Sequence, residues 1–330
     1  MTWSSAEWMT AEFRAELREF VAGAVGEPDV LEPVKVRPWS TVWRAEAGGS
    51  TYFAKQNSPG QAHEAALITA LARIAPEYVV PVVAADPARD LLLTADAGPT
   101  LRAAGAADDP AAWCRIVTDA AALQRAVATH VAELPIGVLA PGDAVGYVAD
   151  AVGRLAALAP DDPRRLDPDI ARALEAHLPV IDAWADQVGD LDLPITLNHN
   201  DLHDNNAFVP SGDAPLRFFD FGDAILTEPL GALLIPLNLC AHLWEAGPDD
   251  PRLRRVADAG LDAWSDLVDL GTLREALPAA LQLARLGRVE CWRRCVATMT
   301  PAELGEWGDA PAYWLGTLLG EPPVGRSPRM

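Results

Sequence analysis

Two different periods of apolar residues divide the first 95 residues of the chain into helical and extended stretches. Residues 11–25 place Phe13, Leu17 and Val21 on one stripe of a helix, and Thr10 is suited to cap its first turn. Short extended runs follow, and Gly48-Gly49 stands where a hairpin turn is needed. We predict strands at residues 30–37, 41–47, 51–56, 79–84 and 91–94, and a helix at residues 61–74. These elements make an antiparallel sheet with one helix inserted after its third strand.

The remainder of the chain has mainly helical periodicity, punctuated by proline and glycine. The helical stretches are residues 110–130, 143–158, 168–188 and nearly everything after Pro229. Residues 195–223 are the exception, because strand-like runs alternate there with polar loops, at 195–197, 207–209 and 217–219. We therefore predict an α+β protein of two lobes. Residues 1–96 form a lobe with an N-terminal helix, a β-sheet and one inserted helix, and residues 97–330 form a large, mostly helical lobe.

Composition supports a folded protein and limits its partners. The 330 residues are 50% hydrophobic and 22% charged, which suits two lobes with a sizeable core. The formal net charge of −21 argues against binding to nucleic acid or to anionic lipid, since both need basic patches. An acidic surface suits a cationic substrate, and it is equally typical of an acidic protein without that role.

The sequence contains no pattern of a signal peptide or a membrane span. Charged residues interrupt the first 23 positions, and the most apolar stretch, 224–244, contains Glu228, Pro229 and Pro236. We expect a cytoplasmic protein. Its four cysteines are too few for a disulfide framework and have no histidine at ligand spacing, so we expect reduced thiols at Cys114, Cys240, Cys291 and Cys295.

Candidate chemistry is concentrated in the polar segment 199–206, which reads His-Asn-Asp-Leu-His-Asp-Asn-Asn, and in Asp220 after the next strands. A solvated turn explains the polarity of this segment but not its spacing. Phosphoryl transfer needs a carboxylate that faces the attacking hydroxyl and an oxygen-rich pair that holds magnesium against the phosphates. Asp201 can supply the first, and Asn206 with Asp220 the second.

These residues carry a family resemblance. The pattern His-x-Asp-Leu-His-x-x-Asn, with a later strand ending in Asp-Phe-Gly-Asp, resembles the aminoglycoside phosphotransferase and choline kinase group, which are distant relatives of protein kinases. The resemblance covers roughly residues 34–233 and implies a bilobal protein-kinase-like fold. It implies that Asp201 is the catalytic base or orients the hydroxyl, that Asn206 and Asp220 bind Mg²⁺, and that His199 and His203 brace the loop.

Two departures from the family pattern concern the geometry of this loop. Asn200 stands where members usually have glycine, and Asp204-Asn205 replaces their Pro-Gly. The protein-kinase motif His-Arg-Asp is missing, and no Ala-Pro-Glu follows Asp220-Phe221-Gly222, so the chain is not expected to be a protein kinase.

The first lobe offers matching residues for a nucleotide. Lys55 ends the third predicted strand, and Glu64 follows nine residues later, in the first turn of the helix predicted at residues 61–74; these are the positions of a phosphate-binding lysine and its glutamate partner. Phe53 shares the sheet face of Lys55, as a roof for the base or as a core residue. The connection Pro38-Trp39-Ser40-Thr41 contains no glycine, and we expect its amides to face phosphate with Ser40 at the tip. The expected nucleotide-binding residues are Ser40, Val42, Phe53, Lys55, Glu64 and the hinge residues Thr94, Ala95, Asp96 and Ala97.

The acceptor site is less defined by the sequence. Carboxylates next to aromatic residues can bind an amine, and they can equally be the solvated face of a helix above core tryptophans. Asp223 lies just past the magnesium aspartate, and the other candidates are Trp244, Glu245, Glu290 and Trp292.

The sequence thus predicts a kinase that uses ATP or GTP with Mg²⁺ to phosphorylate a hydroxyl of a small, amine-bearing molecule. An antibiotic is the first expectation, and choline, an amino sugar or an amino-acid alcohol is the alternative. A catalytically inactive kinase-like binding protein is the alternative of another class. We expect a monomer or a homodimer without nucleic-acid or membrane partners.

Overall fold

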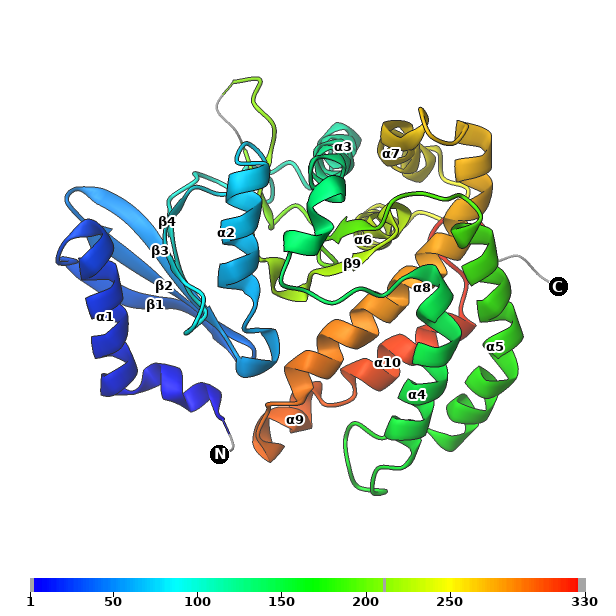
Figure 1. Ribbon diagram of the computed structural model, residues 1–330, viewed down its shortest axis with the longest axis horizontal. Helices are drawn as coiled ribbons and strands as arrows, with labels where there is room; N and C mark the ends of the chain where they lie inside the picture. The colour runs from blue at the N-terminus through cyan, green and yellow to red at the C-terminus, as the bar shows by residue number, and fades with distance from the viewer. Residues whose placement is uncertain (1–2, 210–211, 326–330) are drawn as a thin grey trace.

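A computed structural model describes residues 3–209 and 212–325 and shows two lobes side by side (Figure 1). The N-terminal lobe, on the left in Figure 1, is built on a five-stranded antiparallel sheet with strand order β1-β2-β3-β5-β4. The strands are β1 (Val30–Arg37), β2 (Ser40–Ala47), β3 (Ser50–Asn57), β4 (Val82–Asp86) and β5 (Leu91–Ala95). Gly48 and Gly49 both have positive φ, as the two-residue turn between β2 and β3 requires.

A helix packs on each face of this sheet. Helix α1 (Ala11–Val25) begins at Thr10, whose side chain accepts a hydrogen bond from the backbone N–H of Phe13, and it covers the face that contains Trp43 and Leu93. Helix α2 (Glu64–Ile74) packs on the opposite face, where Leu92 lies, and turns that side of the sheet towards the C-terminal lobe (Figure 1). The alternation of apolar positions along β5 therefore supplies two separate cores.

The C-terminal lobe is mostly helical. Its two small antiparallel sheets pair β6 (Thr196–Asn198) with β9 (Ile225–Thr227), and β7 (Ala207–Phe208) with β8 (Arg217–Phe218). The helices are α3 (Pro110–Val127), α4 (Ala144–Ala156), α5 (Pro168–Gly189), α6 (Leu234–Leu243), α7 (Pro251–Leu261), α8 (Leu270–Val296), α9 (Pro301–Trp307) and α10 (Ala310–Gly316). The short 3₁₀ turns are η1 (Ser5–Met9), η2 (Pro59–Gln61), η3 (Ala128–Glu133), η4 (Pro141–Asp143), η5 (Phe221–Asp223), η6 (Pro229–Leu233), η7 (Asp262–Trp264) and η8 (Thr317–Leu319).

The predicted two-lobed α+β fold is confirmed, and three of its details are wrong. The helix predicted from residue 61 begins at Glu64, because Pro59–Gln61 forms a 3₁₀ turn first. The strand predicted from residue 79 begins at Val82, after Pro81, which has no N–H for a strand ladder. Strand β9 was not predicted, because its three residues lie in a longer apolar run.

The tip of the β1–β2 hairpin contacts the C-terminal lobe. The ring of Trp39 meets Trp292 of α8 edge-on at a centroid distance of 5.4 Å and Trp307 of α9 at 5.0 Å. Trp292 and Trp307 stack on each other with their centroids 5.8 Å apart. We call Trp39, Trp292 and Trp307 the aromatic cluster. It joins the two lobes at one end of the cleft between them.

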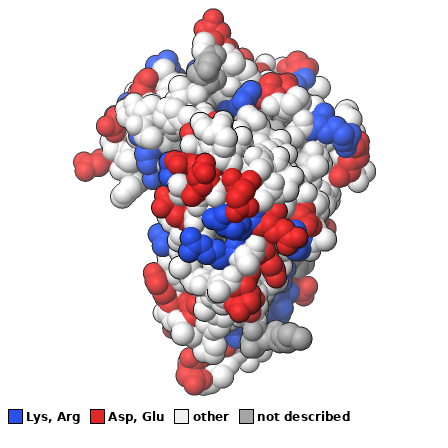
Figure 2. All heavy atoms as spheres, turned by 90° about the vertical axis from the view of Figure 1, so that its left-hand side faces the viewer, with Lys and Arg blue, Asp and Glu red and all other residues white. Residues whose placement is uncertain are grey.

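The surface of the N-terminal lobe carries both signs of charge. On the side that faces left in Figure 1, acidic and basic side chains are interspersed (Figure 2). Ion pairs of this lobe include Arg18 with Glu27 and Arg44 with Glu32. In the described part of the chain, no helix is long and apolar enough to cross a membrane.

Candidate active site

A cleft of about 250 Å³ lies between the lobes, and the residues predicted to bind a nucleotide meet in it. All nine of them line the cleft: Ser40, Val42, Phe53, Lys55, Glu64, Thr94, Ala95, Asp96 and Ala97. Asn206 and Asp220 line its C-terminal side. The expected place of Ser40 is wrong, however, since it is the first residue of β2, paired with Arg37, and the tip is Pro38-Trp39.

Lys55 is held between two carboxylates. Its Nζ lies 2.5 Å from Oε2 of Glu64 and also forms an ion pair with Oδ1 of Asp220. Lys55 and Glu64 are 8% and 1% exposed, so both charges depend on each other for compensation. Burial lowers the pKa of Lys55, but the charges of Asp220 and Glu64 outweigh burial and raise that pKa above its usual value. The lysine is therefore a fixed cation in the cleft.

Glu64 also fixes the segment that follows Asp220. Its Oε1 accepts a hydrogen bond of 2.9 Å from the backbone N–H of Phe221, and its Oε2 accepts one of 2.8 Å from Nδ2 of Asn57. Asp220 itself has a φ of 65°, a left-handed conformation that aspartate tolerates better than most residues. One buried glutamate thus sets the positions of both Lys55 and Asp220.

The loop after β6 is shaped by its asparagines and histidines. Asn200 has a φ of 63°, which explains why asparagine stands where the resembling family has glycine, because these two residues adopt this conformation most readily. His199 donates from Nε2 to the carbonyl of Phe219 at 2.9 Å and accepts the backbone N–H of Asp201 at Nδ1, at 3.4 Å. Burial lowers the pKa of His199, in keeping with this neutral form. Asp204, which with Asn205 replaces the Pro-Gly of the family pattern, is also accommodated: its buried carboxylate forms an ion pair with Arg102 at 2.8 Å.

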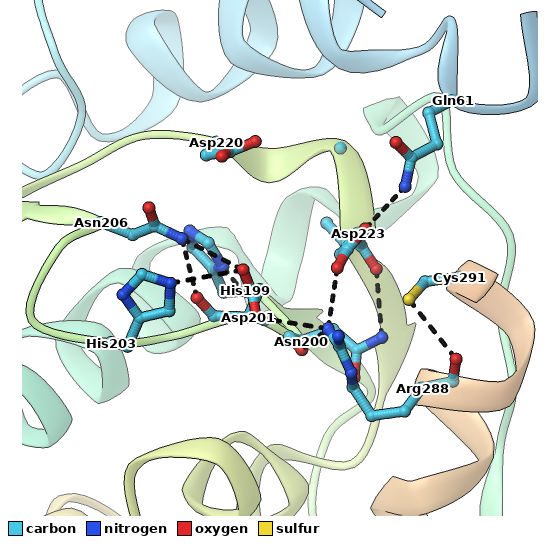
Figure 3. A network of polar contacts seen from close by, with 12 residues as sticks. Gln61, His199, Asn200, Asp201, His203, Asn206, Asp220, Asp223, Arg288 and Cys291 are labelled. Atoms are coloured by element: carbon cyan, nitrogen blue, oxygen red, sulfur yellow. Dashed lines mark hydrogen bonds and ion pairs between the residues drawn. The ribbon is translucent and has the colours of Figure 1, made fainter. Parts of the chain in front are cut away.

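Asp201 lies at the centre of this network (Figure 3). Nε2 of His203 lies 3.4 Å from its Oδ2, and Nη1 of Arg288 lies 3.4 Å from its Oδ1. Burial raises the pKa of Asp201, but the hydrogen bond from His203 and the charge of Arg288 outweigh burial and hold that pKa well below its usual range. Asp201 is therefore a carboxylate at any pH at which the protein is expected to work.

Asn206 and Asp220 form a donor set that fits Mg²⁺. Nδ2 of Asn206 donates to the carbonyl of Asp201 at 3.0 Å, which fixes the amide, and its oxygen points to the side on which Asp220 lies (Figure 3). Burial raises the pKa of Asp220, but the charge of Lys55 outweighs it and the net pKa is lowered, with a smaller contribution from Lys35. One neutral and one anionic oxygen are hard ligands of the kind that Mg²⁺ prefers.

Solved structures with the same architecture are small-molecule kinases and phosphotransferases. An amicoumacin kinase solved with AMP-PNP and Ca²⁺ is 14% identical and matches 97% of this chain and 97% of its own, with a TM-score of 0.61. Aminoglycoside 2'-phosphotransferase-IIIa, solved with GDP, is 12% identical over 94% of this chain and 98% of its own, with a TM-score of 0.59. Choline kinase LicA from Streptococcus pneumoniae is 11% identical over 94% and 98%, with a TM-score of 0.58.

The chain has the protein-kinase-like fold of these small-molecule phosphotransferases. At 11 to 14% identity, the fold is what they share. No protein-family model matches the sequence, and a search of curated proteins finds no match.

On this phosphotransferase fold, the expected acceptor residues lie in different surroundings. Asp223 is next to the loop that contains Asp201, and there Arg288 pairs with its Oδ2 at 2.7 Å and Nε2 of Gln61 donates to its Oδ1 at 2.6 Å (Figure 3). The carboxylate of Glu290 accepts hydrogen bonds of 2.7 Å from Nε and Nη2 of Arg293, and one of 3.0 Å from the hydroxyl of Tyr147. The carboxylates of Asp223 and Glu290 are thus already paired.

The other three acceptor candidates do not gather at Asp201. Trp292 belongs to the aromatic cluster, with its ring against Trp39. Trp244 lies under the guanidinium of Arg252, whose Cζ is 5.2 Å from the ring centroid, and Glu245 is exposed beyond the end of α6. The structure places these two at the junction of α6 and α7, and no hydrogen bond or ion pair among the described residues joins them to Asp223.

Three residues of the site were missed by the sequence analysis. Arg288 is separated from Asp201 by 87 positions, and Gln61 from Asp223 by 162, so no local pattern connects them. Lys35 lines the cleft and carried a signal that was overlooked, because Lys35 and Lys55 are the only lysines in the sequence.

Proposed function

We propose that this protein is a kinase that transfers the γ-phosphoryl group of ATP or GTP to a hydroxyl of a small molecule. One observation carries the proposal: the ion-paired Lys55 and the oxygen pair of Asn206 and Asp220 line one cleft at the junction of two lobes, and the ionised Asp201 lies next to them, with its Oδ2 3.4 Å from Nδ2 of Asn206. The fold agrees, since the similar structures named above are phosphotransferases of small molecules.

The residues suggest a division of labour. Lys55 supplies a fixed positive charge to the phosphates, and the backbone between Thr94 and Ala97 supplies hydrogen-bonding groups for the base edge. Bound Mg²⁺, held by Asn206 and Asp220, would neutralise charge on the phosphates. We propose residues 1–96 as the nucleotide lobe and residues 97–330 as the lobe that presents Asp201 and the acceptor.

Asp201 orients the acceptor rather than acting as a strong base. Its low pKa makes its carboxylate a weak proton acceptor, but a good hydrogen-bond partner for the attacking hydroxyl. In the proposed step, the bond from the γ-phosphorus to the β–γ bridging oxygen breaks and a bond to the acceptor oxygen forms. The hydroxyl proton, hydrogen-bonded to Asp201, becomes more acidic as that bond forms, then passes to the Asp201 carboxylate and on to water. Positioning of this kind supplies most of the catalysis in phosphoryl transfer.

The acceptor proposal goes as far as a small hydroxyl compound. An antibiotic is the first candidate to assay, and choline, an amino sugar or an amino-acid alcohol comes next. Because Asp223 and Glu290 are paired with arginines, an amine that used either carboxylate would have to displace a guanidinium. Neutral hydroxyl compounds therefore belong in the same screen, with consumption of ATP or GTP as the readout.

A substitution at Asp201 separates an active kinase from an inactive binding protein. Asp201→Ala is expected to abolish turnover while ATP or GTP still binds in the presence of Mg²⁺, because Asp201 contacts the acceptor side of the site. Asp182→Ala, on the exposed face of α5, is the matched control and should change neither property. Loss of nucleotide binding in Asp201→Ala would show that its assigned role is wrong. A wild-type protein that binds neither nucleotide would rule out the proposed function.

A further inference from the structure

The two lysines of the chain lie in the same cleft. The sequence contains 26 basic residues of the lysine and arginine type, and only Lys35 and Lys55 among them are lysine. Both line the cleft between the lobes, on β1 and β3. Both lysines of the chain thus lie in one cleft, although lysines make up only two of its 26 lysine and arginine residues.

Strand register places the two lysines in one row across the sheet. Lys35 is opposite Val42 of β2, and Val42 is opposite Lys55 of β3. Residues directly opposite each other on neighbouring strands project from the same face, and three adjacent strands span about 10 Å. The flexible four-carbon stems allow both ammonium groups to reach one elongated anion that lies along the row.

The charges of the two lysines are used differently. Lys55 is neutralised by Glu64 and Asp220, whereas no ion pair among the described residues holds Lys35, which is exposed. Three carboxylates, on Glu64, Asp96 and Asp220, also line the cleft. In a protein with a net charge of −21, Lys35 is therefore the one uncompensated cation among the described residues that line this cleft.

The turn beside Lys35 offers little to a phosphate. The β1–β2 ladder extends to the pair of Arg37 and Ser40, so the turn consists of Pro38 and Trp39 alone. Proline has no N–H, and the side chain of Trp39 is packed in the aromatic cluster. A glycine-rich loop binds phosphates with several unpaired backbone amides. Here the turn itself contributes a single amide.

We propose that Lys35 is a second phosphate-binding residue, whose side-chain charge does at this cleft what the amides of a glycine-rich loop do elsewhere. The inference rests on the proposed function, because it assumes that a nucleotide occupies the cleft. It adds a binding residue that the motifs of the sequence do not include.

Nucleotides that differ only in the number of phosphates test this role. Binding of ATP, ADP and AMP, and of GTP, GDP and GMP, is measured by calorimetry with Mg²⁺ for wild type, Lys35→Gln and Lys35→Arg. Arg37→Gln is the control, since it removes one positive charge from the same strand at an exposed position outside the cleft lining. The melting temperature of each variant shows whether it is folded.

We expect Lys35→Gln to weaken triphosphate binding roughly tenfold, which corresponds to about 1.4 kcal/mol, and to leave monophosphate binding unchanged. Lys35→Arg should restore most of the loss, Arg37→Gln should bind like wild type, and added salt should shrink the difference. Wild-type triphosphate affinity in Lys35→Gln, or an equal loss for mono- and triphosphates, would overturn the inference alone. If wild type binds neither ATP nor GTP, the proposed function fails, and this inference fails with it.

Discussion

Arg288 provides a quantitative test of how α8 supports the catalytic loop. Its Nη1 donates to the carbonyl of Asn200 at 2.6 Å and to Oδ2 of Asp223 at 2.7 Å, and lies 3.4 Å from Oδ1 of Asp201. The residue is 7% exposed, and its guanidinium lies over the ring of Trp314. Arg288→Gln removes the charge and shortens the side chain, so it leaves two carboxylates without their cation.

The expected loss of stability follows from these contacts. Removal of one partner from a buried ion pair costs about 3–5 kcal/mol of unfolding free energy, measurable in urea. Asp223→Asn should be costly for the same reason, but the double variant should lose about 1–3 kcal/mol less than the sum of the two single losses. Because the contacts of Arg288 also orient Asp201, we expect turnover of Arg288→Gln to fall by about tenfold to a hundredfold, with nucleotide affinity unchanged.

Arg285→Gln is the matched control. Arg285 lies one turn earlier on α8 and is 6% exposed, but it donates to carbonyl oxygens of the C-terminal segment, at Thr317 and Glu321. Its replacement should lower stability by about 1.5–3 kcal/mol without affecting turnover of the folded protein. Equal effects of the two substitutions on turnover, or strictly additive losses for Arg288 and Asp223, would refute the reasoning.

Two further predictions concern stability. Gly287→Ala should cost about 1–3 kcal/mol, because its Cβ would lie 2.8 Å from both Oδ1 of Asn200 and Cδ1 of Ile225, whereas Gly153→Ala on α4 meets nothing within 4 Å and should be neutral or stabilising in the same urea assay. Burial raises the pKa of Glu228 from 4.5 to about 7, so its contribution to stability is complete below pH 4.5 and is lost as pH rises through 7, roughly 3 kcal/mol in all. Glu228→Gln should flatten the decline in unfolding free energy between about pH 4 and 8, and an unchanged slope would contradict this assignment.

The sequence predicts this site well where chemistry is grouped on adjacent positions. Asp201 and Asn206 share one loop, and Lys55 ends a strand whose alternation also places Phe53 in the cleft. Such local patterns determine which side chains share a face, and the antiparallel order of the sheet follows from short connections. Glu64 could be placed next to Lys55 because a helix follows the strand after only a short connection.

Other parts of the site depend on packing that no local pattern records. Arg288 reaches Asp201 only because Gly287 lets α8 approach Asn200 closely, which the helical periodicity of α8 does not indicate. The pairing of Asp223 with Arg288 likewise changes an expected amine ligand into part of an internal ion pair. Strand β9 is three residues long and becomes recognisable only through its partner β6.

The aromatic cluster has a consequence for how the cleft opens. Trp39 holds the hairpin tip against α8 and α9, while the segment after β5 connects the lobes covalently at the other end. The N-terminal lobe is thus attached to the C-terminal lobe at two places, covalently after β5 and through the aromatic cluster at the hairpin tip. Separation of the lobes exposes indole surface to water, so the motion has an energetic cost. Because the chain contains 11 tryptophans, the difference in fluorescence between wild type and Trp39→Phe should report this contact.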